Sequence, residues 1–217
     1  MGLYSKYILP HLIQCACSSK PIMKQREKVV PHAEGAILEV GCGSGINFPL
    51  YDRAKAGRIY ALEPHAEMIS KAKAKPERSE GLDIEFLEAG GEAVPLDDHS
   101  IDTVVFTFTL CTIPDWKSSL LEAKRVLKPG GKLLYSEHGG APDDGVAKWQ
   151  RRFEPIQKAL AGGCHLTRSP TAMLAETGFS VDQGEEMYLP STPKIMGYAY
   201  WGQASAQRSG LLPIFPF

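Results

Sequence analysis

Short apolar runs alternate with amphipathic stretches over the first two thirds of the chain. The runs at 36–41 and 58–62 are rich in aliphatic residues, as buried strands are, and the stretches that follow them predict helices at 44–54 and 65–75. The alternation continues with strands expected at 82–87, 101–108 and 132–137 and a helix expected at 115–127. Alternating strands and helices imply a parallel sheet, and right-handed crossovers place helices on both of its faces. The pattern therefore predicts a doubly wound α/β fold.

The alternation ends after residue 137. Helices are expected at 145–161 and 169–177, and they are followed by two strands at 179–188 and 194–201 without a helix between them. A turn rich in proline at 190–193 joins these two strands, so they should pair antiparallel at the end of the sheet.

Apolar residues also recur at helical spacing in the N-terminal stretch 3–30, with an interruption at Pro10. They predict one or two short helices packed over the domain. Several of them have no obvious place in the core of the sheet, namely Tyr4, Tyr7, Leu12 and Ile13. We expect this stretch to act as a lid over a substrate pocket. The chain then divides into a helical lid at 1–30, one α/β domain at 31–206 and a tail at 207–217.

The composition limits the partners of the chain. Its 217 residues carry 24 Lys and Arg against 25 Asp and Glu, so no net field steers the protein to nucleic acid, and a small molecule is the expected partner. Five cysteines without a CxxC pair favour free thiols in the cytoplasm over a disulfide framework. Lys6, His11 and Gln14 interrupt the apolar residues near the N-terminus, which argues against a membrane span there. We expect a cytoplasmic monomer without integral membrane association.

The segment from Glu39 to Gly45, with the sequence EVGCGSG, stands where the first strand passes into the following segment. Open α/β sheets bind ligands at this place, and glycines there let a ligand touch the backbone directly. A dinucleotide fingerprint would require Gly or Ala at the position of Ile46, so the spacing disfavours a nicotinamide cofactor. The alternative is that the glycines only form a tight turn.

Glu63 ends the second strand, about 20 residues after the glycines. A carboxylate at that place can accept hydrogen bonds from both hydroxyls of an adenosine ribose. The alternative is a surface glutamate without a ligand.

Four segments together resemble the signature motifs of class I S-adenosylmethionine-dependent methyltransferases: ILEVGCGSG, the acidic Glu63, GGEAVPLDDHSIDTVV and RVLKPGGKL. The resemblance implies a Rossmann-like seven-stranded sheet of order 3-2-1-4-5-7-6, with strand 7 antiparallel. It also implies an enzyme with S-adenosylmethionine as its cofactor. The cofactor-binding residues would be Glu39, Gly41, Gly43, Gly45, Glu63, Gly91, Glu92 and Thr109. Gly90 stands where the family often has an acidic residue, so adenine recognition would rest on the backbone near Gly91 and Glu92.

A narrower resemblance covers the C-terminal half. Residues 137–138, 153–155, 163–168 and 195–199 are similar to a subgroup that holds bacterial methyltransferases and the animal methyltransferase-like enzymes that methylate small thiols. This resemblance implies a small thiol as the methyl acceptor. A small amine, phenol or lipid headgroup is the alternative within the class, and a protein that binds S-adenosylmethionine without catalysis is the alternative outside it. The animal members carry an N-terminal membrane anchor, whereas the N-terminus here is shorter and more polar.

The acceptor should lie beyond the fourth and fifth strands, facing the cofactor. His138 follows the fifth strand and is the candidate general base, since an imidazole titrates near neutral pH. The alternative is a structural histidine. The expected pocket residues are Tyr4, Tyr7, Cys111, His138, Cys164 and Arg168. Cys164 and Arg168 could instead only hold the loop, and Cys111 is expected to line the pocket. The scattered histidines and the lack of a Cys pair at zinc spacing predict no metal site.

Overall fold

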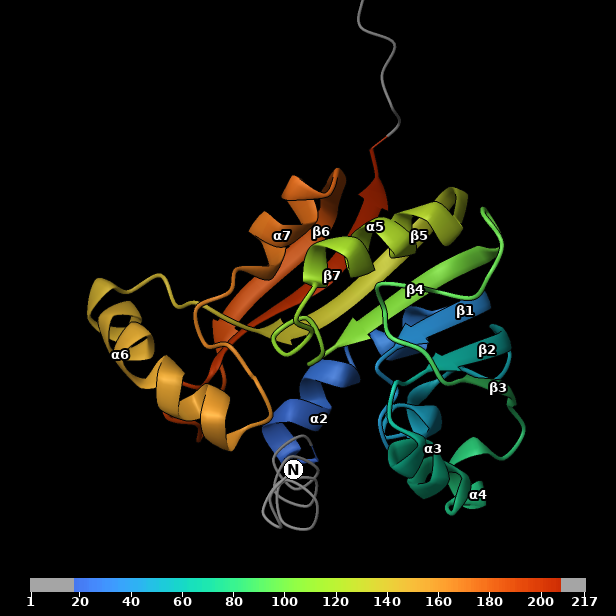
Figure 1. Ribbon diagram of the computed structural model, residues 1–217, viewed down its shortest axis with the longest axis horizontal. Helices are drawn as coiled ribbons and strands as arrows, with labels where there is room; N and C mark the ends of the chain where they lie inside the picture. Colours follow the sequence, from blue (N-terminus) through green and yellow to red (C-terminus); the bar gives the residue numbers. More distant parts are fainter. Residues whose placement is uncertain (1–17, 208–217) are drawn as a thin grey trace, which may run out of the picture.

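The computed structural model describes residues 18–207 and contains a sheet with the strand order β3-β2-β1-β4-β5-β7-β6 (Figure 1). The strands β1 to β5 are parallel, and β7 pairs antiparallel with both β5 and β6. The expected order and the antiparallel seventh strand are therefore confirmed. The strands span Gly35–Val40 (β1), Ala56–Leu62 (β2), Asp83–Leu87 (β3), Ile101–Thr107 (β4), Leu127–His138 (β5), Phe179–Tyr188 (β6) and Tyr198–Ala206 (β7).

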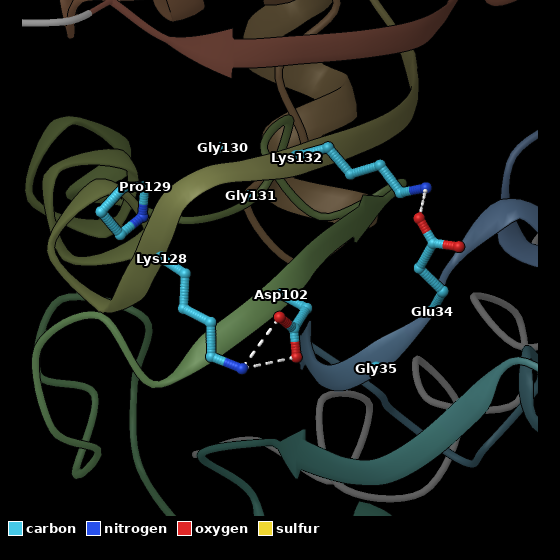
Figure 2. Close-up of a pocket in the computed structure, with 8 residues that line it drawn as sticks. All are labelled: Glu34, Gly35, Asp102, Lys128, Pro129, Gly130, Gly131 and Lys132. Atoms are coloured by element: carbon cyan, nitrogen blue, oxygen red, sulfur yellow. Dashed lines mark hydrogen bonds and ion pairs between the residues drawn. The ribbon is translucent and has the colours of Figure 1, made fainter.

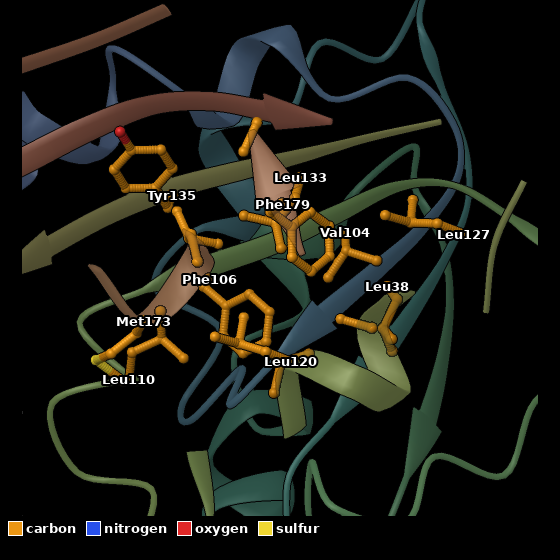
Figure 3. Close-up of a cluster of buried hydrophobic side chains, with 14 of the residues drawn as sticks. Leu38, Val104, Phe106, Leu110, Leu120, Leu127, Leu133, Tyr135, Met173 and Phe179 are labelled. Atoms are coloured by element: carbon orange, nitrogen blue, oxygen red, sulfur yellow. The ribbon is translucent and has the colours of Figure 1, made fainter. Parts of the chain in front are cut away.

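Each central strand sends alternate side chains to opposite faces of the sheet, so the sheet has a core on each side. In β4, Val104 and Phe106 belong to one apolar cluster and Val105 to the other. Figure 3 shows the first cluster, in which Leu120 of α5 and Met173 of α7 pack on the sheet. The second cluster is closed by the segment after α2, by η3 and by α3. Burial on both faces explains why the central strands read as nearly continuous apolar runs.

The helices cover both faces, as the doubly wound pattern predicts. They span Lys20–Arg26 (α2), Ala66–Lys73 (α3), Pro76–Ser79 (α4), Trp116–Val126 (α5), Asp144–Leu160 (α6) and Pro170–Glu176 (α7), with short 3-10 turns at Val30–His32 (η2) and Phe48–Leu50 (η3). α2 and α6 lie beyond the end of the sheet to which the arrowheads of β1, β4 and β5 point (Figure 1). Among the described helices, none combines the length and the apolar character that crossing a membrane requires.

The prediction of a helix at 44–54 is wrong. This segment consists of turns and the three-residue η3. Gly45 has a φ of +70°, which no right-handed helix contains, and Pro49 offers no backbone N–H for a helical hydrogen bond. The chain therefore crosses from β1 to β2 without a regular helix.

Two strand boundaries also differ from the prediction. The strand expected at 132–137 begins earlier, at Leu127, and β5 contains an irregularity at residues 128–131: five residues of β5 advance from Leu127 to Lys132 while two advance on β4. β7 begins at Tyr198 rather than at 194, because residues 193–197 form a turn in which the amide of Met196 donates to the carbonyl of Pro193. Met196 is exposed there, although its apolar character favoured a strand.

The described part of the expected N-terminal lid is α2 and the residues up to Val30. Gln25 and Arg26 of α2 are buried although they are polar, which shows that this helix packs closely on the domain. Tyr4, Tyr7, Leu12 and Ile13 lie outside the described residues, as does the tail from residue 208.

Candidate functional site

The glycines of the first loop lie at the carboxyl end of β1, and all three have a positive φ: +74° at Gly41, +54° at Gly43 and +70° at Gly45. A Cβ at Gly41 would lie 2.6 Å from the methyl group of Thr109, and one at Gly45 would lie 2.5 Å from the ring of Phe48. Among residues 18–207, a Cβ at Gly43 would meet only the methyl group of Met68, at 3.6 Å. Gly41 and Gly45 therefore serve internal packing, whereas Gly43 leaves its Cβ direction open for a ligand.

Glu63 lies at the end of β2 and is only 6% exposed. One oxygen accepts from the backbone N–H of Gly43 at 3.1 Å, and the other accepts from the N–H of His65 at 3.1 Å. The carboxylate is thus fixed beside the open face of the glycine loop. The Nδ1 atom of His65 also lies 2.8 Å from the second oxygen, but its ring is exposed and can turn away. Of about four acceptor sites on the carboxylate, two are then free for ligand hydroxyls.

Behind the glycine loop, five buried polar side chains form one hydrogen-bonded network. Glu39 accepts from Asn47 Nδ2 and from the Tyr51 hydroxyl, both at 2.9 Å. Arg26 reaches in from α2 and donates to Asn47 Oδ1 at 2.9 Å and to Thr107 Oγ1 at 2.6 Å. Burial raises the pKa of Glu39 to about 7, against the opposing effect of its hydrogen bonds and of Arg26. The network therefore ties α2 to the ends of β1 and β4.

At the carboxyl ends of β4 and β5, a second buried carboxylate holds the loop that follows β4. Glu137 is 0% exposed, and one of its oxygens accepts from the backbone N–H groups of Thr109 at 2.8 Å and Leu110 at 3.0 Å. Burial raises the pKa of Glu137. Phe108, just before this loop, has a φ of +52°, and its ring stacks on His138 with the ring centroids 6.4 Å apart. Glu137 of β5 therefore fixes the loop that follows β4.

His138, Cys111 and Cys164 converge although they come from three different segments. The Nε2 atom of His138 lies 3.0 Å from the Sγ atom of Cys164, and the Sγ atom of Cys111 lies within 4.8 Å of both. Burial acts to lower the pKa of His138, but Cys164 and Glu137 outweigh it and raise that pKa above its usual value. The neighbouring Cys111 thiol and burial raise the pKa of Cys164 far above its usual range. The prediction of no metal site rested on spacing alone and did not anticipate this cluster.

The loop that carries Cys164 is held on both sides. Glu154 of α6 accepts from the backbone N–H groups of Leu166 at 3.1 Å and Thr167 at 2.8 Å, and it pairs with His165 at 3.0 Å. Arg168 donates to the carbonyl oxygens of Leu110 and Ile113, which belong to the loop after β4. The structure thus gives Arg168 the loop-tying role that was the alternative to a pocket role.

Gly91 and Glu92 lie in the loop after β3, at the same edge of the sheet as Glu63. Gly91 is buried, and a Cβ there would lie 2.9 Å from Ser119 Oγ and 3.1 Å from Val40. Glu92 is exposed. Close packing therefore accounts for Gly91.

A separate hollow lies at the amino ends of the strands, opposite to the end that holds the glycine loop (Figure 2). It is lined by residues at the amino ends of β1 and β5, and two ion pairs cross it, Lys128 with Asp102 at 2.8 Å and Lys132 with Glu34 at 2.6 Å. None of the predicted site residues lies there. These ion pairs join the starts of three strands, and we assign the hollow no ligand.

The sequence did not single out Arg26, Asn47, Tyr51, Thr107 or Phe108. Asn47 and Tyr51 follow the glycine motif closely, which was a usable signal because polar residues in that turn must find partners. No sequence pattern indicated a role for Arg26, because its partners Asn47 and Thr107 lie 21 and 81 residues away in the chain.

Comparison with known proteins agrees with this geometry. Residues 38–135 match the family model described as a methyltransferase domain. The human thiol S-methyltransferase TMT1B is 37% identical over 172 residues, which cover 76% of this chain and 70% of that protein. The human thiol S-methyltransferase TMT1A is 32% identical over 177 residues, which cover 78% of this chain and 72% of that protein. Both matches extend beyond the segment that matches the family model.

Among solved structures, an S-adenosylmethionine-dependent methyltransferase from Methanosarcina mazei is similar in fold, with a TM-score of 0.63. The match covers 87% of this chain and 98% of that one, at 23% identity. At this level of identity the likeness concerns the fold alone.

The raised pKa of Glu39 predicts a pH dependence of stability. The pKa of Glu39 in the folded protein, about 7, lies above its ordinary value of 4.5. The protonated carboxyl group therefore adds to the free energy of unfolding in full below pH 4.5, and this contribution is lost as the pH rises through 7. A shift of this size corresponds to about 3 kcal/mol. The free energy of unfolding of the wild type, minus that of the Glu39→Gln variant, should fall by up to this amount between pH 4.5 and 8. Urea unfolding at several pH values measures it. A difference that stays constant would mean that Arg26 keeps Glu39 ionised in the folded protein.

Proposed function

The chain belongs to the S-adenosylmethionine-dependent methyltransferases, and from this membership we propose that it methylates a small thiol. The observation that carries the proposal is the 37% identity to a thiol S-methyltransferase, which extends over three quarters of the chain. The match includes segments outside the cofactor-binding half, so the likeness is not confined to the part that holds S-adenosylmethionine. A small amine, phenol or lipid headgroup is the alternative acceptor.

The residues at the carboxyl end of β1 fit the cofactor. Gly43 has an open Cβ direction, and the nearly buried Glu63 carboxylate beside it offers two acceptor sites to the ribose hydroxyls once the exposed His65 ring turns away. We assign Glu39, Gly41, Gly45 and Thr109 to the support of this cradle, and Gly91 and Glu92 to the adenine side. When bound, S-adenosylmethionine supplies a methyl group activated as a sulfonium.

The enzyme's own task is then to orient the acceptor and exclude water. Orientation of reacting groups can supply an effective molarity of about 10⁵ to 10⁸ M. A thiol with a pKa near 8.5 is already a few per cent ionised at pH 7, so it needs little further activation. The Cys111, His138 and Cys164 side chains lie beyond the fourth and fifth strands, which is where we place the acceptor.

We also propose that residues 1–30 form a lid over this place, with Tyr4 and Tyr7 in the acceptor pocket. The buried Arg26 of α2 supports the idea, because it already joins this part of the chain to the site. The near balance of charges favours a small acceptor over nucleic acid, and we propose a cytoplasmic monomer.

The acceptor class can be tested directly. The purified protein should transfer a labelled methyl group to small alkyl or aryl thiols in preference to amines, phenols and lipid headgroups of similar size. The measurement is the labelled product, identified by mass spectrometry, with the alcohol analogue of each thiol as its control. Preferential labelling of an amine, a phenol or a lipid would refute the thiol proposal and leave the methyltransferase assignment intact.

The ribose contact can be tested with Glu63→Ala. Loss of charge-assisted hydrogen bonds should weaken S-adenosylmethionine binding by about 1.5 to 3 kcal/mol. Calorimetric titration measures it, with circular dichroism to confirm the fold. Glu67→Ala is the matched control, since Glu67 is an exposed carboxylate four residues away. Equal dissociation constants for the two variants would place the ribose elsewhere.

The general-base role of His138 stays a prediction. If His138 accepts the thiol proton, His138→Ala should lower turnover by up to about 30-fold at neutral pH, because about 3 per cent of a thiol with a pKa near 8.5 is already ionised at pH 7. The deficit should shrink as the pH rises, because the thiol then ionises without help. The pH profile from 6 to 9 measures this. A deficit that is the same at every pH would indicate a positioning role for His138.

A further inference from the structure

The cluster of Cys111, His138 and Cys164 contains more than a methyl transfer requires. Displacement at a sulfonium needs orientation and no nucleophile from the enzyme. Yet two thiols and an imidazole point to one place, with all three of their potential ligand atoms within 4.8 Å of one another. Cys111 and Cys164 are both buried and free of disulfide bonds. These three side chains are therefore the part of the site that the proposed function does not yet explain.

The surrounding contacts fix the backbone around Cys111 and Cys164, and His138 is the last residue of β5. Glu137 holds the loop before Cys111 through two backbone N–H groups, and the carbonyl of Cys111 accepts from the N–H of His165 at 2.8 Å. Glu154 holds the residues that follow Cys164. The ring of Phe108 stacks on His138 and limits how its imidazole can turn. Such support of the residues around potential ligands is typical of metal sites, whose outer partners orient the ligands.

We propose that Cys111, His138 and Cys164 bind one Zn²⁺ ion as three protein ligands and leave its fourth position open. In a tetrahedral zinc site with such ligands, the ligand atoms lie about 3.5 to 3.8 Å apart, so the observed cluster needs only small side-chain adjustments. Thiolate and imidazole ligands select zinc over magnesium or calcium, which prefer oxygen. Two thiolates neutralise the charge of the ion, and binding releases their two protons to solvent.

The open position gives the site a function that rests on the proposed thiol methylation. An acceptor thiol binds there as a thiolate after its proton leaves to solvent, because a coordinating thiol is deprotonated by the ion. A lone pair of the thiolate sulfur forms the new S–C bond while the C–S bond of the sulfonium breaks. The electron pair of that bond stays on the cofactor sulfur, so both products are neutral thioethers. A neutral thioether is a poorer zinc ligand than a thiolate, which favours release of the product.

With zinc bound, His138 is a ligand and cannot accept the proton of the acceptor. The base role predicted above then belongs to the metal-free protein alone. The metal content of each preparation therefore has to accompany every pH profile.

The test uses the full chain, reduced and stripped with a chelator, and titrated with Zn²⁺ and with Co²⁺ as a spectroscopic substitute. We expect one equivalent of each metal to bind. The Co²⁺ form should show a thiolate-to-cobalt charge-transfer band and the intense visible bands of tetrahedral cobalt. A small thiol such as 2-mercaptoethanol should shift these visible bands by entering the fourth position, and its alcohol analogue should leave them unchanged.

Variants identify the ligands. Cys111→Ser, Cys164→Ser and His138→Ala should each lower the affinity for Zn²⁺ by more than about 100-fold, beyond the 10- to 100-fold typical of outer partners. Cys42→Ser and His99→Asn are matched controls for metal binding. Cys42 lies in the glycine loop, and His99 pairs with the carbonyl of Leu127. Asn also tolerates the positive φ of His99. Both controls should bind Zn²⁺ like the wild type.

Three outcomes would overturn the proposal: no zinc binding by the reduced protein, a cobalt spectrum without the thiolate band, or equal affinity in the Cys111→Ser/Cys164→Ser double variant. These readouts do not depend on activity. A protein that binds zinc through these ligands but methylates no thiol would refute the proposed acceptor and leave the metal site standing. Thiol methylation by a protein that binds no zinc would refute the metal site alone.

Discussion

A carboxylate buried at the end of a strand needs hydrogen-bond donors, and at the carboxyl edge of this sheet backbone amides supply many of them. Glu63 binds the amide of Gly43, Glu137 binds the amides of Thr109 and Leu110, and Glu154 binds those of Leu166 and Thr167. Glu63 and Glu137 would be costly to bury without these bonds, and each loop would lose one of its ties without its carboxylate. The shape of the site therefore depends on three carboxylates, each of which accepts hydrogen bonds from the backbone of one loop.

The same principle separates the two halves of the site. Around the glycine loop, Glu63 leaves acceptor sites available to a ligand, whereas Glu39 is enclosed by Asn47 and Tyr51 and serves the framework. Where we place the acceptor, Glu137 Oε1 binds backbone amides and Glu154 binds backbone amides together with the His165 and Thr167 side chains, and the neighbouring groups are two thiols and an imidazole. The carboxylates thus hold the loops, and the thiols and the imidazole are the groups to which we assign the proposed chemistry.

The sequence predicted the fold well because strand and helix periodicity, turn residues and the glycine motif all indicate a doubly wound sheet, and the resemblance to the methyltransferase motifs implied its strand order. It failed at 44–54, where the apolar periodicity of a helix was present but Gly45 and Pro49 prevent one. The candidate cofactor residues lie in short contiguous motifs, so the sequence could predict that they meet at the carboxyl ends of the strands. It could not show that Cys111, His138 and Cys164 meet, since they are separated by 27 and 26 residues and only the packing of two loops brings them together. Arg26 is a similar case, because its partners come from distant strands.

The direction of β7 has a practical consequence for work with this enzyme. β7 runs antiparallel to β5, so Ala206 ends it near the amino edge of the sheet, next to the start of β6 at Phe179. With a rise of about 3.3 Å per residue, the nine residues of β7 carry the chain roughly 25 to 30 Å away from the edge that holds His138. An affinity handle or a surface linker joined to the chain beyond this strand starts from the far side of the sheet, so the protein can be immobilised there with its reactive edge facing the solution.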